Sequence, residues 1–244
     1  MGRAFEYRKA RKMKRWANMA RTFTKVGREI AIAVKEGGPE AEYNPRLRLA
    51  IQNAKAANMP KANVENAIKR ASSKDAADYQ EVVFEGYAPH GVAVIVETAT
   101  DNNTRTVADV RHVFSKYGGS LGVSGSVDYQ FERRGLIKIK ADATDPEELE
   151  LELIDFGLEE MAREEEEEGE ELLLLYSAFL DYAKLQKALE ERGLEIVESS
   201  LIRQPLHGKS LADEEAEAVI RLLDKMEELD DVVNVFHNMD MDDQ

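Results

Sequence analysis

Residues 81–100, EVVFEGYAPHGVAVIVETAT, decide the fold class because they combine two strand-like runs with a tight turn. Valine, isoleucine, threonine and aromatic residues dominate residues 82–87 and 92–98, and the turn between them holds Pro89 and Gly91. Apolar β-formers interrupted by Pro and Gly are typical of paired strands. The sequence therefore predicts a sheet in the middle of the chain.

The chain continues from this pair of strands with a helix and a further strand. Residues 104–117 carry valines and Phe114 on one helical face, and a glycine pair at 118–119 ends the helix. Residues 118–126, GGSLGVSGS, are expected to form a flexible loop. Alternating apolar side chains in residues 126–132 then predict a third strand and a ββαβ unit.

A second unit follows in residues 134–205, and its elements have the order βαββαβ. The expected elements are a strand at 136–140, a helix at 146–156, strands at 158–162 and 172–176, a helix at 182–192 and a strand at 195–202. This order is that of a ferredoxin-like domain. The glutamate run that starts at Glu164 is expected to be a solvated loop tip between two strands, because consecutive carboxylates do not converge on a cation.

The last elements, a helix at 213–229 and a strand at 232–237, have no partner of their own. An isolated helix and strand cannot bury their apolar sides, so they are expected to return and complete the first sheet. The fold class is then α+β with three domains. We predict a helical domain at 1–75, a discontinuous domain at 79–133 plus 206–240, and a ferredoxin-like domain inserted at 134–205.

The first 75 residues show apolar stripes at helical spacing and breaks between them. Gly37-Gly38 ends one helix, Asn44-Pro45 starts a second as N-cap and first residue, and Met59-Pro60 separates a third. The last two helices and their short turn also permit a helix-turn-helix motif. The third helix has few arginines at its start for guanine contacts, which favours binding directed at the nucleic-acid backbone.

Charge is distributed unevenly along this chain of 244 residues, whose formal net charge is −15. Residues 1–75 hold 18 basic and 7 acidic residues, a balance of +11, whereas the remainder carries −26. A basic end binds polyanions, and an acidic body repels phosphate and keeps the molecule soluble. The basic end is therefore the predicted site of contact with nucleic acid.

Residues 7–28, YRKARKMKRWANMARTFTKVGR, are the most basic part of that end and include Tyr7, Trp16 and Phe23. Cations neutralise phosphates, and aromatic rings stack on unpaired bases. The alternative is a solvated basic tail. The candidate nucleic-acid-binding residues are Arg8, Lys9, Arg11, Lys12, Lys14, Arg15, Trp16, Arg21, Lys25, Arg28, Arg46, Arg48, Lys55, Lys61, Lys69 and Arg70.

A polar cluster at residues 100–106, TDNNTRT, is the candidate for a second contact through Asn102, Asn103 and Arg105. It follows a predicted strand and starts a predicted helix. Its side chains suit helix capping, and an exposed helix N-terminus beside an arginine suits a phosphate equally well. Both interpretations stay open at this stage.

Residues typical of catalysis or metal binding are scarce. The four histidines are scattered, no phosphate-binding glycine motif is present, and the chain has no cysteine. We therefore expect no enzyme activity, no cofactor, no metal and no small-molecule substrate. No apolar run is long enough to span a membrane and no secretory signal is visible, so we expect a cytoplasmic protein without a membrane partner.

Several long motifs together resemble the YebC/PmpR family, which includes the mitochondrial translational activator of cytochrome c oxidase. They are RWANMARTFTKVGREI, NPRLRLAIQNAKAANMPKANVENAIKRA, FEGYAPHGVAVIVETATDNNTRTVADVRHVF, GGSLGVSGSVDYQFERRG and DVVNVFHNM, and they cover nearly the whole chain. The resemblance implies a cytoplasmic three-domain α+β protein without catalytic activity. It also implies a role in gene expression, as a DNA-binding transcriptional regulator or as a translation factor at the ribosome, including at proline-rich stretches.

Two functional classes follow. The first is a ribosome-associated translation factor whose basic domain contacts ribosomal or transfer RNA, and the second is a DNA-binding transcriptional regulator. The acidic body and the weak recognition helix favour RNA, which proteins bind through shape, backbone and stacking.

Overall fold

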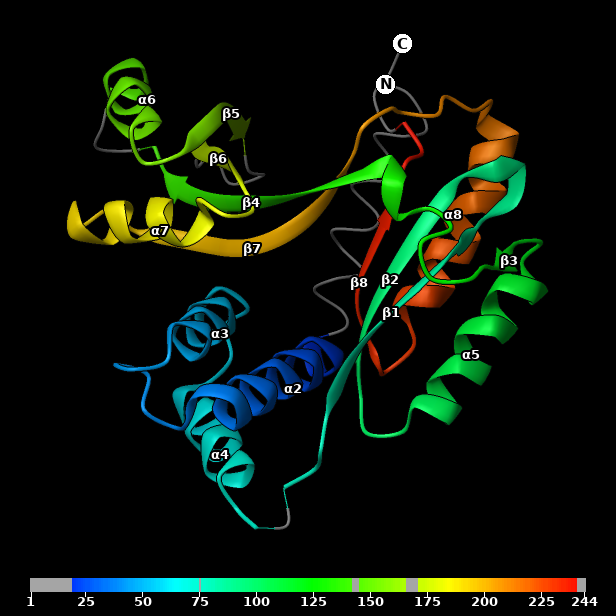
Figure 1. The fold of residues 1–244 in the computed structure, drawn as a ribbon, viewed down its shortest axis with the longest axis horizontal. Coiled ribbons are helices and arrows are strands. Elements are labelled where there is room, and N and C mark those ends of the chain that lie inside the picture. The colour runs from blue at the N-terminus through cyan, green and yellow to red at the C-terminus, as the bar shows by residue number, and fades with distance from the viewer. Residues whose placement is uncertain (1–18, 75, 142–144, 166–170, 241–244) are drawn as a thin grey trace. The chain divides into compact units, whose positions relative to one another are not determined.

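The computed structural model describes residues 19–74, 76–141, 145–165 and 171–240 (Figure 1). It combines helices with two four-stranded sheets, which confirms the α+β fold class. The chain forms two compact units. The first holds the described residues up to Ala50, residues 59–132 and those from Pro205 onward, and the second holds residues 51–58 and 133–204.

Three helices start the described chain: α2 (Met19–Gly37), α3 (Pro45–Ala56) and α4 (Lys61–Ala71). Helix α2 packs against α4, and its buried side chains follow the predicted stripe, with Val26, Ile30 and Val34 inward. Burial of such a stripe, at about 25 cal/mol per Å² of apolar surface, is what stabilises short helices in a bundle.

Asn44 connects the end of α2 to the start of α3. Its side-chain oxygen accepts a hydrogen bond from the Leu47 amide (3.0 Å), as an N-cap does. Its side-chain nitrogen donates to the carbonyl oxygens of Ala33 (2.7 Å) and Gly38 (2.8 Å), which belong to the preceding helix and its end. The predicted N-cap is confirmed, and the same side chain also fixes the turn.

The first sheet has the strand order β3-β1-β2-β8. Its strands are β1 (Gln80–Tyr87), β2 (Ala93–Thr100), β3 (Ser120–Leu121) and β8 (Val232–His237). A short 3-10 turn (Pro89–Gly91) joins the antiparallel strands β1 and β2. Strand β8 pairs with β2 from Val94 opposite His237, so the C-terminal strand does return to this sheet as predicted.

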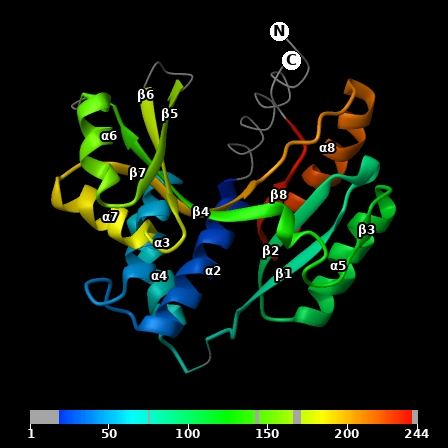
Figure 2. The ribbon, with the colours of Figure 1, turned by 45° about the horizontal axis from the view of Figure 1, so that its top comes forward.

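Helices α5 (Asn103–Lys116) and α8 (Asp213–Glu227) cover one face of this sheet (Figures 1 and 2). The core between them includes Phe84, Val94 and Val96 from the strands and Phe114 and Leu222 from the helices. The other face carries a smaller cluster around Ile95, and α2 lies against β2 there. This packing brings the helical region and the sheet together within one unit.

One predicted element of the first sheet is wrong. Residues 126–132 do not form a strand of it; residues 128–130 form a 3-10 turn, and one long strand, β4 (Phe131–Lys140), runs on into the second unit. The alternation misled because Val127 and Phe131 are buried against Ile95, whereas Tyr129 between them is 71% exposed. The fourth strand of the sheet is instead β3, inside the expected glycine-rich loop.

The carboxylate of Glu85 explains why that segment is irregular. It accepts hydrogen bonds from the amides of Gly125 (2.7 Å), Val127 (2.8 Å) and Asp128 (2.9 Å). Because these donors bond to a side chain, they are not used in a strand ladder. Glu85 is itself buried in β1, so it holds the loop after β3 against the sheet.

The second unit contains a sheet of order β5-β6-β4-β7, which is the strand order of a ferredoxin-like domain. Its remaining elements are α6 (Pro146–Ile154), β5 (Leu158–Glu165), β6 (Glu171–Ala178), α7 (Tyr182–Glu191) and β7 (Ile196–Pro205). The predicted order of elements is confirmed. Strand β5 extends to Glu165, further than expected, and the rest of the glutamate run lies outside the described residues.

Candidate nucleic-acid interface

The described residues begin at residue 19, so part of the predicted interface lies outside them. The predicted contacts that fall there are Arg8, Lys9, Arg11, Lys12, Lys14, Arg15 and Trp16. Their role as the basic run that binds phosphate stays a prediction. The described cations of the helical region, from Arg21 to Arg70, are the ones whose surroundings can be compared.

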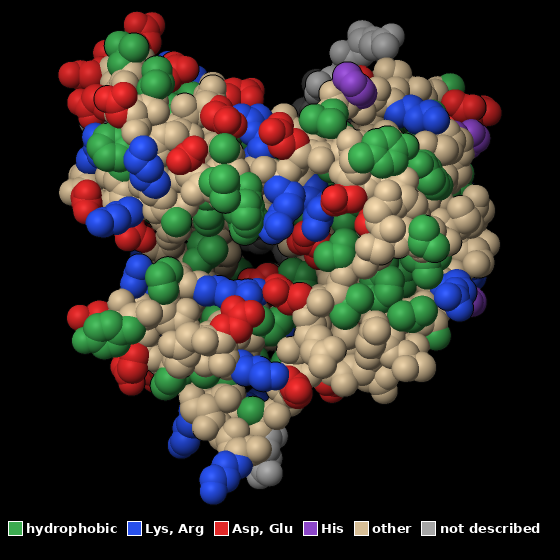
Figure 3. All heavy atoms as spheres, in the orientation of Figure 1, with side chains coloured by type: hydrophobic (Ala, Val, Ile, Leu, Met, Phe, Trp, Pro, Cys, Tyr) green, Lys and Arg blue, Asp and Glu red, His purple; other side chains and the backbone are tan. Residues whose placement is uncertain are grey.

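Five of the described candidates are exposed: Arg21, Lys55, Lys61, Lys69 and Arg70. Three of these cations lie on α4, and Figure 3 shows Lys and Arg side chains projecting in the region of that helix, whereas Asp and Glu gather over α6. The Nζ of Lys61 lies 3.8 Å from Oε1 of Glu65, one helical turn further on, and the two form a weak surface ion pair. Lys55 lies in residues 51–58, which belong to the second unit.

Two other candidates on the helices are engaged in structural contacts. The Arg46 guanidinium pairs with Glu36 (2.7 Å) and with Glu81. The Arg48 guanidinium donates to the carbonyl oxygens of Ala41 (3.1 Å) and Glu42 (2.9 Å), where it closes the loop between α2 and α3. A phosphate at either arginine would compete with these partners.

Lys25 and Arg28 face the sheet from α2. The Lys25 Nζ donates to the carbonyl oxygen of Glu227 (3.3 Å) at the end of α8. Arg28 is only 13% exposed and forms an ion pair with Asp231 (2.9 Å), and it also donates to the carbonyl oxygens of Ala99 (3.3 Å) and Asp230. Arg28 therefore fastens α2 to the sheet.

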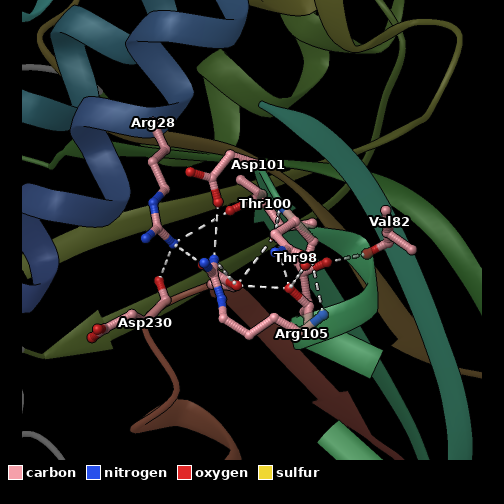
Figure 4. Close-up of polar contacts among 11 residues, drawn as sticks. Arg28, Val82, Thr98, Thr100, Asp101, Arg105 and Asp230 are labelled. Carbon is pink, nitrogen blue, oxygen red and sulfur yellow. Dashed lines mark hydrogen bonds and ion pairs between the residues drawn. The ribbon is translucent and has the colours of Figure 1, made fainter. Parts of the chain in front are cut away.

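Asp231 is the centre of this network, which Figure 4 shows around Arg28, Thr100 and Arg105. Its carboxylate, 8% exposed, accepts from the Arg105 guanidinium (2.8 Å), from the Thr106 hydroxyl (2.7 Å) and from the Thr100 hydroxyl (3.2 Å). Burial by itself would raise the pKa of Asp231, but Arg105, Thr106 and Arg28 outweigh it and lower the pKa below the ordinary value. Asp231 is therefore charged at neutral pH.

The polar cluster at residues 100–106, predicted as a candidate second contact, caps the N-terminus of α5 in the structure. Asn102 is the N-cap of α5, and its side-chain oxygen accepts from the Arg105 amide (3.1 Å). The Arg105 guanidinium pairs with Asp101 (2.9 Å) as well as with Asp231. Asn103 is exposed at the first residue of the helix. Because two carboxylates neutralise Arg105, the phosphate contact stays a prediction with little support from this geometry.

Glu29 is a half-buried acid on α2, close to carboxylates of the first sheet. Burial raises its pKa to about 7, against the opposing effect of Arg46, and the carboxylates of Glu81 and Glu97 raise it further. Half of such side chains are therefore protonated near neutral pH. The side of α2 that faces the sheet is thus rich in acidic groups, and its cations are used to neutralise them.

A groove of about 620 Å³ lies on another side of α2, between this helix, α4 and the segment that follows α4. Its lining includes Phe23, Gly27, Arg28, Asn63, Asn66, Arg70 and Tyr79. Volumes of 300–1,000 Å³ are usual for sites that bind small molecules or parts of larger ligands. This groove is a concave feature beside the described cations of the predicted basic region.

Sequence reasoning missed the importance of several of these residues. Phe23 was predicted as an aromatic residue of the basic run, and it lines the groove, whereas Tyr79 carried no prediction although it also contributes to the groove. Asp231 carried no recognisable motif, since its partner Arg28 is 203 positions earlier in the chain. Among the described residues no group of three or more His, Cys, Asp or Glu is arranged to hold a metal ion.

Comparison with known proteins identifies the family. Residues 3–74 match the family model described as the TACO1/YebC protein N-terminal domain. Residues 79–239 match the one described as the TACO1/YebC second and third domain. The chain belongs to the TACO1/YebC family. The resemblance to the YebC/PmpR family that the sequence motifs indicated is therefore confirmed.

Bacterial members of the TACO1/YebC family match this chain along almost its entire length. A relative from Flavobacterium johnsoniae is 56% identical over 239 residues, which cover 98% of this chain and 99% of that protein. Another from Parabacteroides distasonis is 56% identical over 244 residues, covering 100% and 98%. Both carry the name "Probable transcriptional regulatory protein".

A solved structure also shares the family fold. The crystal structure of a conserved hypothetical protein from Aquifex aeolicus matches with a TM-score of 0.78 and 42% sequence identity. The match covers 91% of this chain and 90% of that one. In the described part of this chain, no helix is both long and apolar enough to cross a membrane.

Proposed function

We propose that this chain regulates gene expression by binding nucleic acid through its N-terminal helical region, as a translation factor that contacts RNA at the ribosome. The observation that carries the proposal is the contrast in charge. A chain of net charge −15 has a balance of +11 in its first 75 residues, and exposed cations on α4 lie beside an open groove. Cations at such a surface bind phosphates and release counterions, whatever the base sequence.

Two features favour RNA. The helix that would read a DNA groove, α4, begins with Lys61 and Asn63, and its arginine, Arg70, is near its end. Specific contacts with duplex DNA mostly come from the N-terminal part of a recognition helix. The groove beside α4 is lined with aromatic and amide side chains, which suit unpaired bases.

The second candidate is a DNA-binding transcriptional regulator. The names of the relatives favour it, since both the Flavobacterium johnsoniae and Parabacteroides distasonis proteins are called probable transcriptional regulatory proteins. Cations on α4 would bind DNA phosphates as well as RNA phosphates. In either case we propose a role without catalysis, because the proposed action requires binding alone and the relatives are named as regulators.

Crosslinking in living cells, followed by purification of the chain and sequencing of the attached nucleic acid, tests the proposal. Ribosomal or transfer RNA among the crosslinked molecules is the expected result. Crosslinks confined to a few promoter segments would instead support the transcriptional regulator. Recovery of no nucleic acid above an uncrosslinked control would contradict both, and so would turnover of a small metabolite by the purified chain.

A further inference from the structure

The groove between α2 and α4 differs from the rest of the chain in its charge. Asp and Glu make up 48 of the 244 residues, yet none of the described residues that line the groove is acidic. Arg28 and Arg70 both line it. A hollow whose described lining includes an exposed cation, Arg70, and no carboxylate suits an anionic ligand.

Two aromatic rings line the same groove. Phe23 comes from α2 and Tyr79 from the segment before β1, and both are half-buried. The Arg28 guanidinium lies 5.5 Å from the centre of the Tyr79 ring, and Arg28 is itself held by Asp231. This fixes one wall of the groove. Exposed faces of rings and guanidinium groups are the surfaces on which unpaired bases stack.

Two amide side chains complete the lining. Asn63 and Asn66 are three residues apart on α4, so they lie on one face of the helix, and both are exposed. Asparagine is a weaker helix former than alanine, and neither residue caps the helix. A carboxamide pairs with adenine through one donor and one acceptor, which match N7 and the N6 amino group.

Gly27 lines the groove at a position that has free space around it. It lies in the middle of α2, where glycine costs about 1 kcal/mol relative to alanine. Its backbone does not have the positive φ that would favour glycine, and a Cβ placed there would meet nothing within 4 Å. The packing therefore leaves space at this position in the groove.

We propose that the groove holds one unpaired adenine nucleotide of a polynucleotide strand. The base stacks on the aromatic wall, an asparagine of α4 reads its edge, and Arg70 meets the phosphate. This inference rests on the proposed binding of nucleic acid and names the nucleotide that the same region selects.

The test measures binding of the full chain to labelled twelve-nucleotide strands by fluorescence anisotropy at fixed salt. The probes are oligouridine, the same strand with one central adenosine, the same strand with one central guanosine, and the deoxy counterparts of all three. We expect the adenosine strand to bind roughly tenfold more tightly than oligouridine, the effect of one good amide–adenine pair. An adenine preference in RNA alone, or in both RNA and DNA, supports the groove assignment.

Two variants remove the preference by different routes. The double substitution Asn63→Ala and Asn66→Ala removes the amides, and Gly27→Leu fills the groove without changing charge. Each is expected to reduce the tenfold preference to less than twofold and to leave the salt dependence of binding unchanged. Gly27→Ala adds only a methyl group, and Glu65→Gln changes an exposed residue of α4 outside the groove, so both controls should keep the preference.

Specific outcomes would overturn the inference. Equal binding of all strands by the unaltered chain, a preference for guanosine, or an adenine preference that survives both Gly27→Leu and the double asparagine substitution would each exclude an adenine site in this groove. In those cases nucleic-acid binding itself would still stand. Failure of every strand to bind at low ionic strength would instead overturn the proposed function together with the inference.

Discussion

Arg28 and Arg70 both reach the groove between α2 and α4, but their surroundings are opposite. Arg28 is nearly buried and is held by Asp231 and by the carbonyl oxygen of Ala99 in β2, whereas Arg70 is exposed on α4. A cation that already has a buried carboxylate as partner contributes to folding, and an exposed cation is available to a phosphate. A basic segment therefore contains both kinds of cation, and the neighbouring acids decide which of them are available to a ligand.

The largest loss of stability is expected when Asp231, the ion-pair partner of Arg28, is replaced. Asp231→Ala leaves Arg28 without its carboxylate partner, and breaking a buried pair in this way typically costs about 3–5 kcal/mol. Urea unfolding would measure the change. Asp230→Ala is the matched control, because its side chain is exposed and only its backbone oxygen contacts Arg28. Equal loss of stability in the two variants would show that Asp231 has no special role.

A pH-dependent effect is expected from Glu29, on the same side of α2. Its pKa is about 7 in the folded chain against an ordinary 4.5, so the folded state holds an extra proton between these values. Stability therefore falls as pH rises from 4.5 to 7, by about 3 kcal/mol at most, and stays reduced above pH 7. Glu29→Gln removes this loss.

Unfolding free energies of the unaltered chain and of Glu29→Gln at several pH values check this prediction. The variant should be the more stable protein at pH 8, and the difference should shrink as the pH falls through 7 and vanish well below the ordinary pKa of 4.5, where the carboxyl is neutral in both states. A difference that does not change with pH would mean that the side chain is ionised in the fold and that the surrounding acids do not affect it.

Substitution of the two arginines is expected to affect different quantities. Arg28→Ala should change the free energy of unfolding, and Arg70→Ala should change the binding of RNA. Arg28→Ala should destabilise the chain by about 2–3 kcal/mol, because it leaves Asp231 with one cation fewer. Arg70→Ala should change stability by less than about 0.5 kcal/mol. It should lower the salt slope of single-stranded RNA binding by about 0.7, the value for one phosphate contact. The opposite pattern in paired unfolding and binding measurements would reverse the assignment.

Much of the fold was predictable because local patterns and global packing agree. The Asn44-Pro45 pair predicts a helix start, and the structure shows the Asn44 cap. The βαββαβ order predicts the ferredoxin-like sheet, and the need of the C-terminal strand for a partner predicts its pairing with β2. In each case the residues that carry the signal are close together in sequence or have only one place to bury their apolar sides.

The strand error came from a contact that periodicity does not reveal. Alternation at 127–131 is the same for a strand and for an irregular segment whose apolar residues are buried on a sheet face. The buried carboxylate of Glu85, about 40 residues earlier, accepts hydrogen bonds from three amides of that segment. The segment is therefore irregular and does not form a strand. No local pattern connects Glu85 with the loop.

The candidate site was predictable in composition but not in arrangement. Counting charges places the cations in residues 1–75, but it cannot distinguish Arg46, paired with Glu36 and Glu81, from the exposed Lys69. The groove was not predictable either, because it depends on how α2 packs on α4 and on where Tyr79 lies after the turn. Pairing and concavity are properties of the tertiary structure.

The central claim is that the exposed cations of the helical region, and not exposed cations in general, bind the polynucleotide. The measurement that tests it most directly is the salt dependence of single-stranded RNA binding by the full chain and by two charge-matched variants. One variant replaces Arg21, Lys61, Lys69 and Arg70 with alanine. The other replaces four exposed cations of α5 and α8 in the same unit, Arg111, Lys116, Arg221 and Lys225.

Both variants lose four positive charges, so a change in overall charge affects them equally. The account predicts that the slope of log affinity against log salt falls by about 2–3 in the helical-region variant, at about 0.7 per lost contact, and stays unchanged in the α5 and α8 variant. Equal slopes in the two variants, whether both reduced or both unchanged, would contradict it.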